Sequence, residues 1–130
     1  HMTDSSYFEN TKGTSFLATV DPEGRPNMAV YSRPHVLEDG TLGFIMAARR
    51  SYSNVSSSPH AHYLFVEEGE GWRGKRLGLT KVGEETDPEV IAALRRRTYS
   101  PEEEAKVGPL TLVKFQVTEE RPLVGFGPQA

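Results

Sequence analysis

The segment 46–54 combines the residue types that bind anions in proteins. An apolar stretch runs into Arg49 and Arg50, and hydroxyl residues then open a predicted short helix. The first N–H groups of a helix have no intrahelical partner, and a guanidinium forms charge-assisted hydrogen bonds with oxyanions. Arg50, Ser51 and Ser53 therefore predict a site for a phosphate monoester. A plainer interpretation stays open, in which the arginines are solvated and Ser51 only caps the helix.

A second group of candidate residues lies on the segment 26–33, which is predicted to be a strand after a tight turn. Alternation places its side chains on two faces: Asn27, Ala29, Tyr31 and Arg33 on one, and Met28, Val30 and Ser32 on the other. If this strand pairs with the segment 42–47, its polar face lies near the same strand ends as Arg50. A polar wall that includes an aromatic residue suits a planar heterocycle. The alternative is an edge strand with a solvated polar face.

The third candidate element is the glycine-rich segment 69–76, which contains the single tryptophan. Trp72 stands among glycines and cations, including Arg73 and Arg76. A tryptophan in this setting is suited to stacking and to contacts with anions. The alternative is a long hairpin whose tryptophan packs on its own barrel.

The histidines and the known catalytic motifs give no competing site. His60 and His62 would share a strand face, but neither they nor His35 have further ligands at convincing spacing, so no metal is expected. His1 precedes the first methionine and is left out of any site. No Gly-x-Ser-x-Gly or Walker sequence occurs, so the sequence indicates neither a hydrolase nor a nucleoside triphosphatase. The arginines at 95–97 favour a solvated helix end.

Composition narrows the classes of partner. The chain has 130 residues, a formal net charge of −3 and no cysteine. An acidic balance disfavours nucleic-acid binding, which depends on a basic surface. The lack of cysteine excludes disulfides and thiolate chemistry and fits a cytoplasmic protein. No apolar run approaches the roughly 18 residues that span a bilayer, and no signal-peptide pattern is present, so no membrane partner is expected.

Turn and cap signals predict the elements that hold these residues. The polar segment 2–13 is either a short helix or a loose arm, and a short helix is expected over 51–58. Asp87 and Ser100 each begin a further predicted helix, with Val90, Ile91 and Leu94 as the apolar stripe of the first. Strands are expected at 14–20, 26–33, 42–47, 61–67, 75–85 and 110–119, with 42–47 central because it is apolar on both faces. No early helix is long enough to cross between parallel strands, so we predict a mainly β, six-stranded antiparallel barrel forming one domain over 1–130.

The ordered set of motifs resembles the pyridoxamine-5′-phosphate-oxidase-like, flavin-binding split-barrel superfamily. The matching segments are 16–27 (FLATVDPEGRPN), 40–46 (GTLGFIM), 50–54 (RSYSN) and 58–65 (SPHAHYLF). The resemblance covers residues 13–82 well and the last strand loosely. Residues 87–108 look like a helical insertion that only some members have.

The resemblance implies a homodimer that binds flavin mononucleotide (FMN) at the subunit interface. The segment 27–33 would flank the isoalloxazine ring, Arg50 and Ser51 would hold the phosphate, and residues 72–76 would approach from the partner chain. Backbone groups near Ser32 and Met46 would contact the ring edge. The candidate cofactor-binding residues are Asn27, Val30, Tyr31, Ser32, Arg33, Met46, Ala47, Arg50, Ser51, Ser53, Asn54, Trp72, Arg73 and Arg76.

The expected activity is an FMN-dependent oxidoreductase that passes electrons between small molecules, with no catalytic residue assigned. The chain is shorter than true pyridoxamine phosphate oxidases and lacks their C-terminal substrate-binding extension, which argues against vitamin B6 oxidation. Two alternatives stay open: a flavin or haem protein that only binds or transfers electrons, and a dimeric interaction module with a vestigial pocket. A deazaflavin in place of FMN is a further variant.

Overall fold

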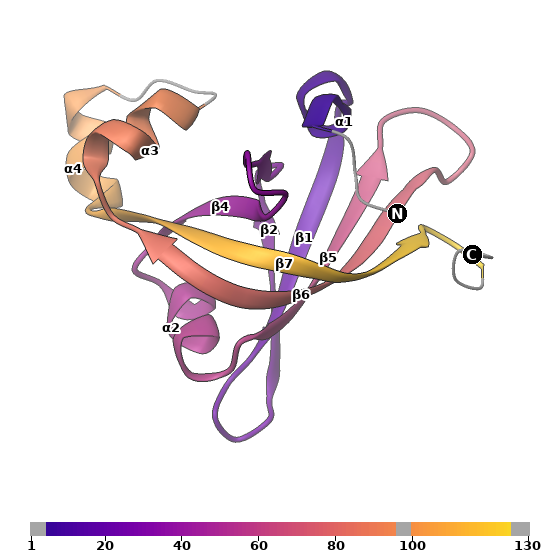
Figure 1. Cartoon of the computed structure of the whole chain (residues 1–130), viewed down its shortest axis with the longest axis horizontal. Coiled ribbons are helices and arrows are strands. Elements are labelled where there is room, and N and C mark those ends of the chain that lie inside the picture. The colour runs from indigo at the N-terminus through magenta and orange to yellow at the C-terminus, as the bar shows by residue number, and fades with distance from the viewer. Residues whose placement is uncertain (1–4, 96–99, 126–130) are drawn as a thin grey trace.

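The fold is one long antiparallel sheet that curls around a core, with short helices at its ends (Figure 1). The computed structural model describes residues 5–95 and 100–125. In chain order the elements are α1 (Ser5–Asn10), β1 (Gly13–Val20), β2 (Pro26–Tyr31), β3 (His35–Val36), β4 (Leu42–Ala47), α2 (Arg50–Ser57), β5 (His60–Glu67), β6 (Gly74–Glu85), α3 (Pro88–Leu94), α4 (Pro101–Val107) and β7 (Leu110–Pro122). The mainly β, antiparallel half-barrel predicted from the sequence is confirmed, with seven strands in place of six.

The strand order is β2-β1-β5-β6-β7-β4-β3, and every pairing in it is antiparallel. The pairing of β2 with β4, considered as one possibility from the sequence, does not form, since β2 is an edge strand hydrogen-bonded to β1. β4, predicted as a central strand, is paired on both sides, with β7 and with the two-residue β3, and most of its residues are buried. Alternation reveals the faces of a strand but not its partner. The curl of the sheet nevertheless brings β2 and β4 to opposite sides of one seam (Figure 1).

Aromatic side chains dominate the core inside the curl. Phe44 on β4 is buried and meets three rings edge to face, those of Tyr31, Tyr63 and Phe115, at centroid distances of 6.1, 5.2 and 5.6 Å. On β7, Leu112, Val113 and Phe115 are buried, and the half-buried Lys114 lies between the last two. Such edge-to-face contacts add to the large hydrophobic contribution of the rings. The core therefore extends directly to the seam.

Local turn signals in the sequence are confirmed. In the β1–β2 turn, the carboxylate of Asp21 accepts hydrogen bonds from the backbone N–H groups of Glu23 and Arg25 at 2.9 and 2.8 Å. Gly24 takes a φ of +86°, which favours glycine. The β3–β4 turn has the same logic, with Gly40 at φ +87°. The polar segment 2–13 had two interpretations, and its described part forms α1, whose Phe8 is fully buried.

The two helices between β6 and β7 form as predicted. Asp87 caps α3 by accepting from the N–H of Glu89 at 2.9 Å, and Ser100 forms a capping box with Glu103. Of the predicted apolar stripe on α3, Ile91 is buried, whereas Val90 is exposed and Leu94 is half-buried. The predicted cluster 95–97 is described only at its first residue; the other two lie outside the described residues.

Candidate functional site

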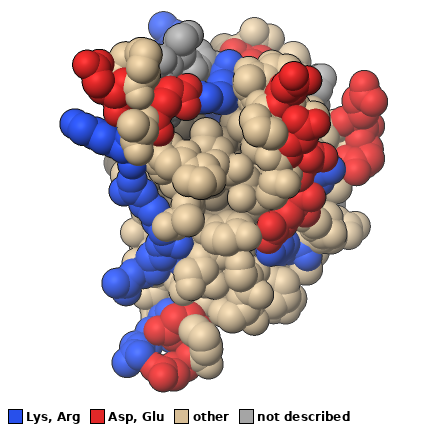
Figure 2. All heavy atoms as spheres, turned by 90° about the vertical axis from the view of Figure 1, so that its left-hand side faces the viewer, with Lys and Arg blue, Asp and Glu red and all other residues tan. Residues whose placement is uncertain are grey.

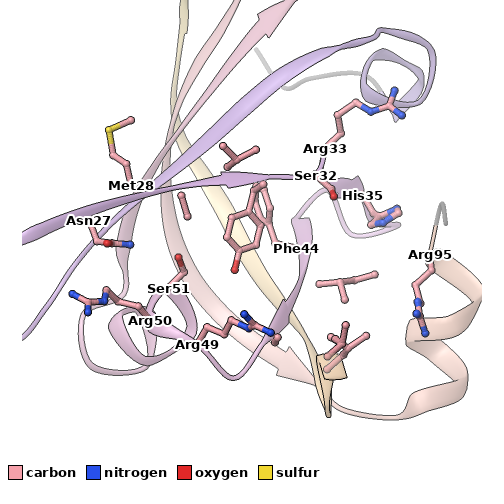
Figure 3. Close-up of a pocket in the computed structure, with 17 residues that line it drawn as sticks. Asn27, Met28, Ser32, Arg33, His35, Phe44, Arg49, Arg50, Ser51 and Arg95 are labelled. Atoms are coloured by element: carbon pink, nitrogen blue, oxygen red, sulfur yellow. The ribbon is translucent and has the colours of Figure 1, made fainter. Parts of the chain in front are cut away.

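A cavity of about 510 Å³ lies at the seam between β2 and β4. Pockets for small molecules and cofactors in proteins have volumes of roughly 300–1,000 Å³. The β2 side, the β4 side, the start of α2 and the α3–α4 insertion all contribute to its wall (Figure 3). The lining residues are Asn27, Met28, Ala29, Val30, Tyr31, Ser32, Arg33, His35, Phe44, Ile45, Ala47, Arg49, Arg50, Ser51, Arg95, Val107 and Leu110.

The β2 wall presents the polar face that the alternation predicted. Asn27, Ala29 and Tyr31 are half-buried, whereas Met28 and Val30 on the other face are 65% and 71% exposed. Burial raises the pKa of the Tyr31 hydroxyl, and this effect is opposed by a hydrogen bond with the Ser51 side chain and by the positive charge of Arg49. Tyr31 therefore stays protonated at neutral pH and can donate a hydrogen bond in the cavity.

The start of α2 supplies hydroxyl and backbone donors. The predicted role of Ser51 as N-cap is wrong, because Arg49 holds the N-cap position, with no side-chain capping bond, and the helix begins at Arg50. Ser51 lies in the first turn and is only 4% exposed. An arginine has no acceptor with which to cap a helix, so the first-turn N–H groups remain available to an anion. The Ser51 hydroxyl therefore does not cap the helix. It lies at the cavity wall, where it forms a hydrogen bond with the Tyr31 hydroxyl.

Arg49 and Arg50 direct their guanidinium groups to different parts of the cavity (Figure 3). Arg50 extends toward Asn27 at the mouth. Hydrogen bonds from the backbone and side chain of Arg25 lower the pKa of Asp21, and the positive charge of Arg50 adds to this effect. Arg50 therefore lies near the exposed β1–β2 turn, where an anion could approach it from solvent. Arg49 is exposed as well, and its guanidinium lies apart from that of Arg50.

Several residues predicted for the site have other roles or positions. Arg33 lines the cavity, but its Nη1 donates to the carbonyl oxygens of Phe8 and Thr11 at 2.7 and 2.9 Å, so it joins α1 to the barrel. Asn54 is buried and donates to the Thr19 hydroxyl at 3.0 Å, which fixes α2 on β1. Met46 is a core residue, and neither it nor Asn54 or Ser53 lines the cavity, whereas Val30, Ser32 and Ala47 do.

The β5–β6 loop stands apart from the cavity within this chain (Figure 1). Trp72 is 71% exposed and has a φ of +49°, so the alternative in which it packs on its own barrel is wrong. Arg73 is exposed. Arg76 donates to the carbonyl oxygens of Pro122 and Gly125 at 2.8 and 2.6 Å and so holds the end of β7.

The sequence did not single out the residues that close the far end of the cavity. Arg95, Val107 and Leu110 come from the insertion and the start of β7. They follow β2 by more than sixty positions, and no local pattern links them to it. His35 also lines the cavity, and its Nδ1 lies 3.9 Å from a carboxylate oxygen of Glu9.

The lining is strongly cationic although the chain is acidic. It contains four arginines and one histidine but no aspartate or glutamate. Figure 2 shows basic side chains along one edge of this side of the molecule, and acidic side chains along the opposite edge and at the top. A concave wall of one sign raises the local concentration of oppositely charged ligands. The charge of the lining therefore favours anions over cations.

Two further findings concern residues 5–95 and 100–125. Within these ranges, no three histidine or acidic side chains come together in a way that could hold a metal ion. None of the helices described there has the length and apolar character needed to span a bilayer.

Several solved structures have folds similar to that of this chain. They include an F420 reductase (TM-score 0.71, 15% identity, 92% of this chain and 98% of the other covered) and an FMN-binding protein from Syntrophomonas wolfei (0.70, 19%, 94% and 84%). A candidate pyridoxamine 5′-phosphate oxidase from Lactobacillus delbrueckii is also similar (0.63, 18%, 89% and 88%). No protein-family model and no curated protein sequence matches the chain. The fold is thus the split barrel that these proteins share, as the motifs predicted.

Proposed function

We propose that this protein binds FMN in the cavity between β2 and β4 and acts as a flavin-dependent oxidoreductase on a small molecule. The observation that supports this most is the combination at the start of α2: the uncapped first turn, Arg50, and the buried Ser51 hydroxyl, all beside one cavity. Helix N-termini and arginine both favour phosphate. The similar folds of an FMN-binding protein and an F420 reductase support a flavin-type cofactor.

The cavity residues fit an FMN molecule by size and chemistry. Arg50, Ser51 and the first-turn N–H groups of α2 would hold the phosphate. Ala29 and Ala47, on the two sides of the seam, leave room for a planar ring system. Tyr31 would remain a protonated donor beside Ser51. The flavin would supply the redox chemistry, while the protein binds it and controls access.

Titration of FMN into flavin-free protein tests the cofactor. We expect quenching of FMN fluorescence with a dissociation constant of about 10 µM or below, which corresponds to about −7 kcal/mol. Riboflavin, which lacks the phosphate, should bind at least about tenfold more weakly, because it loses the charge-assisted bonds at α2. Absence of FMN binding at tens of micromolar would contradict the proposal.

The same experiment separates the other cofactors. A deazaflavin is the second candidate, favoured by the similarity to an F420 reductase. If it is the cofactor, it should displace bound FMN, or it should bind to the protein although FMN does not. A Soret band in freshly purified protein would identify haem. Steady-state assays with nicotinamide cofactors then distinguish an enzyme from a carrier, because a carrier holds flavin that is never reduced.

We further propose that the protein is a homodimer with the cavity at or near its interface. β2 is an edge strand, and its outer face exposes Met28 and Val30. Exposed apolar side chains on a free strand edge favour association with another chain. Trp72, on a glycine-rich loop, is also exposed and could reach a partner's cavity. Light scattering should give about twice the 14.4 kDa chain mass; a monomer at all concentrations tested would refute the dimer.

A further inference from the structure

The end of the cavity remote from α2 is formed by the α3–α4 insertion. Arg95, which follows the last residue of α3, lies across the cavity from Arg50 (Figure 3). Val107, the last residue of α4, and Leu110, the first residue of β7, complete this end. It therefore consists of one cation flanked by two apolar side chains. None of these residues belongs to the phosphate site proposed at α2.

The Arg95 side chain is held in place by the insertion itself. It is 16% exposed, and its Nη2 lies 3.1 Å from Oε2 of Glu104 on α4. This ion pair joins the two helices, and the capping box at Ser100 fixes the start of α4. The guanidinium also borders a second cavity, of about 220 Å³, between the insertion and β7. A guanidinium has five N–H donors in a planar fork, so it can serve a ligand oxygen as well as Glu104.

We propose that Arg95 recognises an anionic group, a carboxylate or a phosphate, on the substrate. This rests on the proposed function, in which the cofactor's own phosphate lies at α2. Val107 and Leu110 would contact the apolar part of the same substrate. The α3–α4 insertion is thus a specificity element, and the substrate class is small organic anions with an apolar body.

Charge complementarity supports an anion at this end. Every titratable side chain in the lining is an arginine, a histidine or the protonated Tyr31. The carboxylates of Glu104 and Glu9 lie outside the lining, where they approach Arg95 and His35. One phosphate at α2 would neutralise Arg50, and the exposed Arg49 and the Glu104-paired Arg95 would remain as further cations of the lining. A concave wall that carries several cations and no carboxylate of its own raises the local concentration of anions. A second anion is therefore favoured over a neutral substrate.

Three probes test the proposal: benzoate, phenyl phosphate and the neutral benzamide. Ligand-observed NMR and calorimetry are run on the flavin-free protein and on the FMN-loaded protein, so that the readout does not depend on turnover. We expect at least one anion to bind in the millimolar range or better, and benzamide at least about tenfold more weakly. Arg95→Gln should weaken anion binding about tenfold or more, because it removes a charge-assisted bond.

Two further variants serve as controls. Arg121→Gln removes a β7 arginine outside the cavity lining, and it should leave anion binding unchanged. Glu104→Gln releases Arg95 from its ion pair, and it should tighten anion binding severalfold. Circular dichroism and thermal melting establish that each variant is folded before binding is measured.

The outcomes separate this proposal from the cofactor proposal. FMN affinity should change less than about twofold in Arg95→Gln; a loss as large as that caused by changes at Arg50 and Ser51 would place Arg95 in the cofactor site and overturn the proposal. Equal binding of benzamide and benzoate, or no effect of Arg95→Gln on the anions, would overturn it too. If anions need Arg95 while FMN binds nowhere, the anion site stands and the proposed cofactor is wrong.

Discussion

Replacing Arg50 and Ser51 together with alanine is expected to weaken FMN binding by about a hundredfold or more. Each side chain would give the phosphate at least one charge-assisted hydrogen bond, and such bonds contribute about 1.5–3 kcal/mol each. A loss of about 3 kcal/mol corresponds to about a hundredfold change in dissociation constant. Fluorescence titration of FMN measures it. Riboflavin binding should change much less, because riboflavin has no phosphate to lose.

The matched control is the double variant Ser56→Ala, Arg121→Ala. Ser56 lies on the solvent side of the same helix, where its hydroxyl donates to the Tyr52 carbonyl at 2.8 Å, and Arg121 lies on β7 outside the cavity lining. It removes the same residue types and should keep FMN affinity within about twofold. Unchanged retention of FMN by the Arg50, Ser51 variant would place the phosphate elsewhere and favour a vestigial pocket at α2.

The features that the sequence predicted well are those decided by neighbouring residues. The turn at Asp21, the cap at Asp87 and the capping box at Ser100 each depend on two or three consecutive positions, and each forms as expected. The arginine and hydroxyl residues that follow β4 were also placed at one helix start for local reasons. The N-cap was misassigned by two residues. Serine is a better capping residue than arginine, so Ser51 was expected at this position, but Arg49 holds it.

The features that could not be predicted are set by contacts between distant segments. The pairing of β2 depends on the order of the whole sheet, in which β4 pairs with β7 across more than sixty residues. Arg95 lines the cavity only because β6 and β7 pair with each other, which places the α3–α4 segment that connects them beside β2 and β4. Alternation along one strand holds no information on either arrangement. The wall of the site nearest the chain start was therefore predictable, and the opposite wall was not.

Replacing Phe44 with alanine is expected to lower the free energy of unfolding by about 3–5 kcal/mol. The ring is 1% exposed and packs edge to face on three other rings, so its removal leaves a cavity that those neighbours cannot fill by rotating. This is a large fraction of the roughly 5–15 kcal/mol that holds a domain folded. Urea unfolding, followed by circular dichroism, measures the change.

Trp72→Ala is the control for this prediction, since it removes an aromatic side chain that is 71% exposed. Its effect on unfolding should stay within about 0.5 kcal/mol. Phe44 also lines the cofactor cavity and supports Tyr31, so Phe44→Ala should weaken FMN binding even under conditions where the variant is fully folded. A stability loss below about 1.5 kcal/mol would show that the rings are not packed as described. A normal FMN affinity in a folded, destabilised variant would show instead that Tyr31 keeps its position without Phe44, and that core and site are separable at this point of the seam.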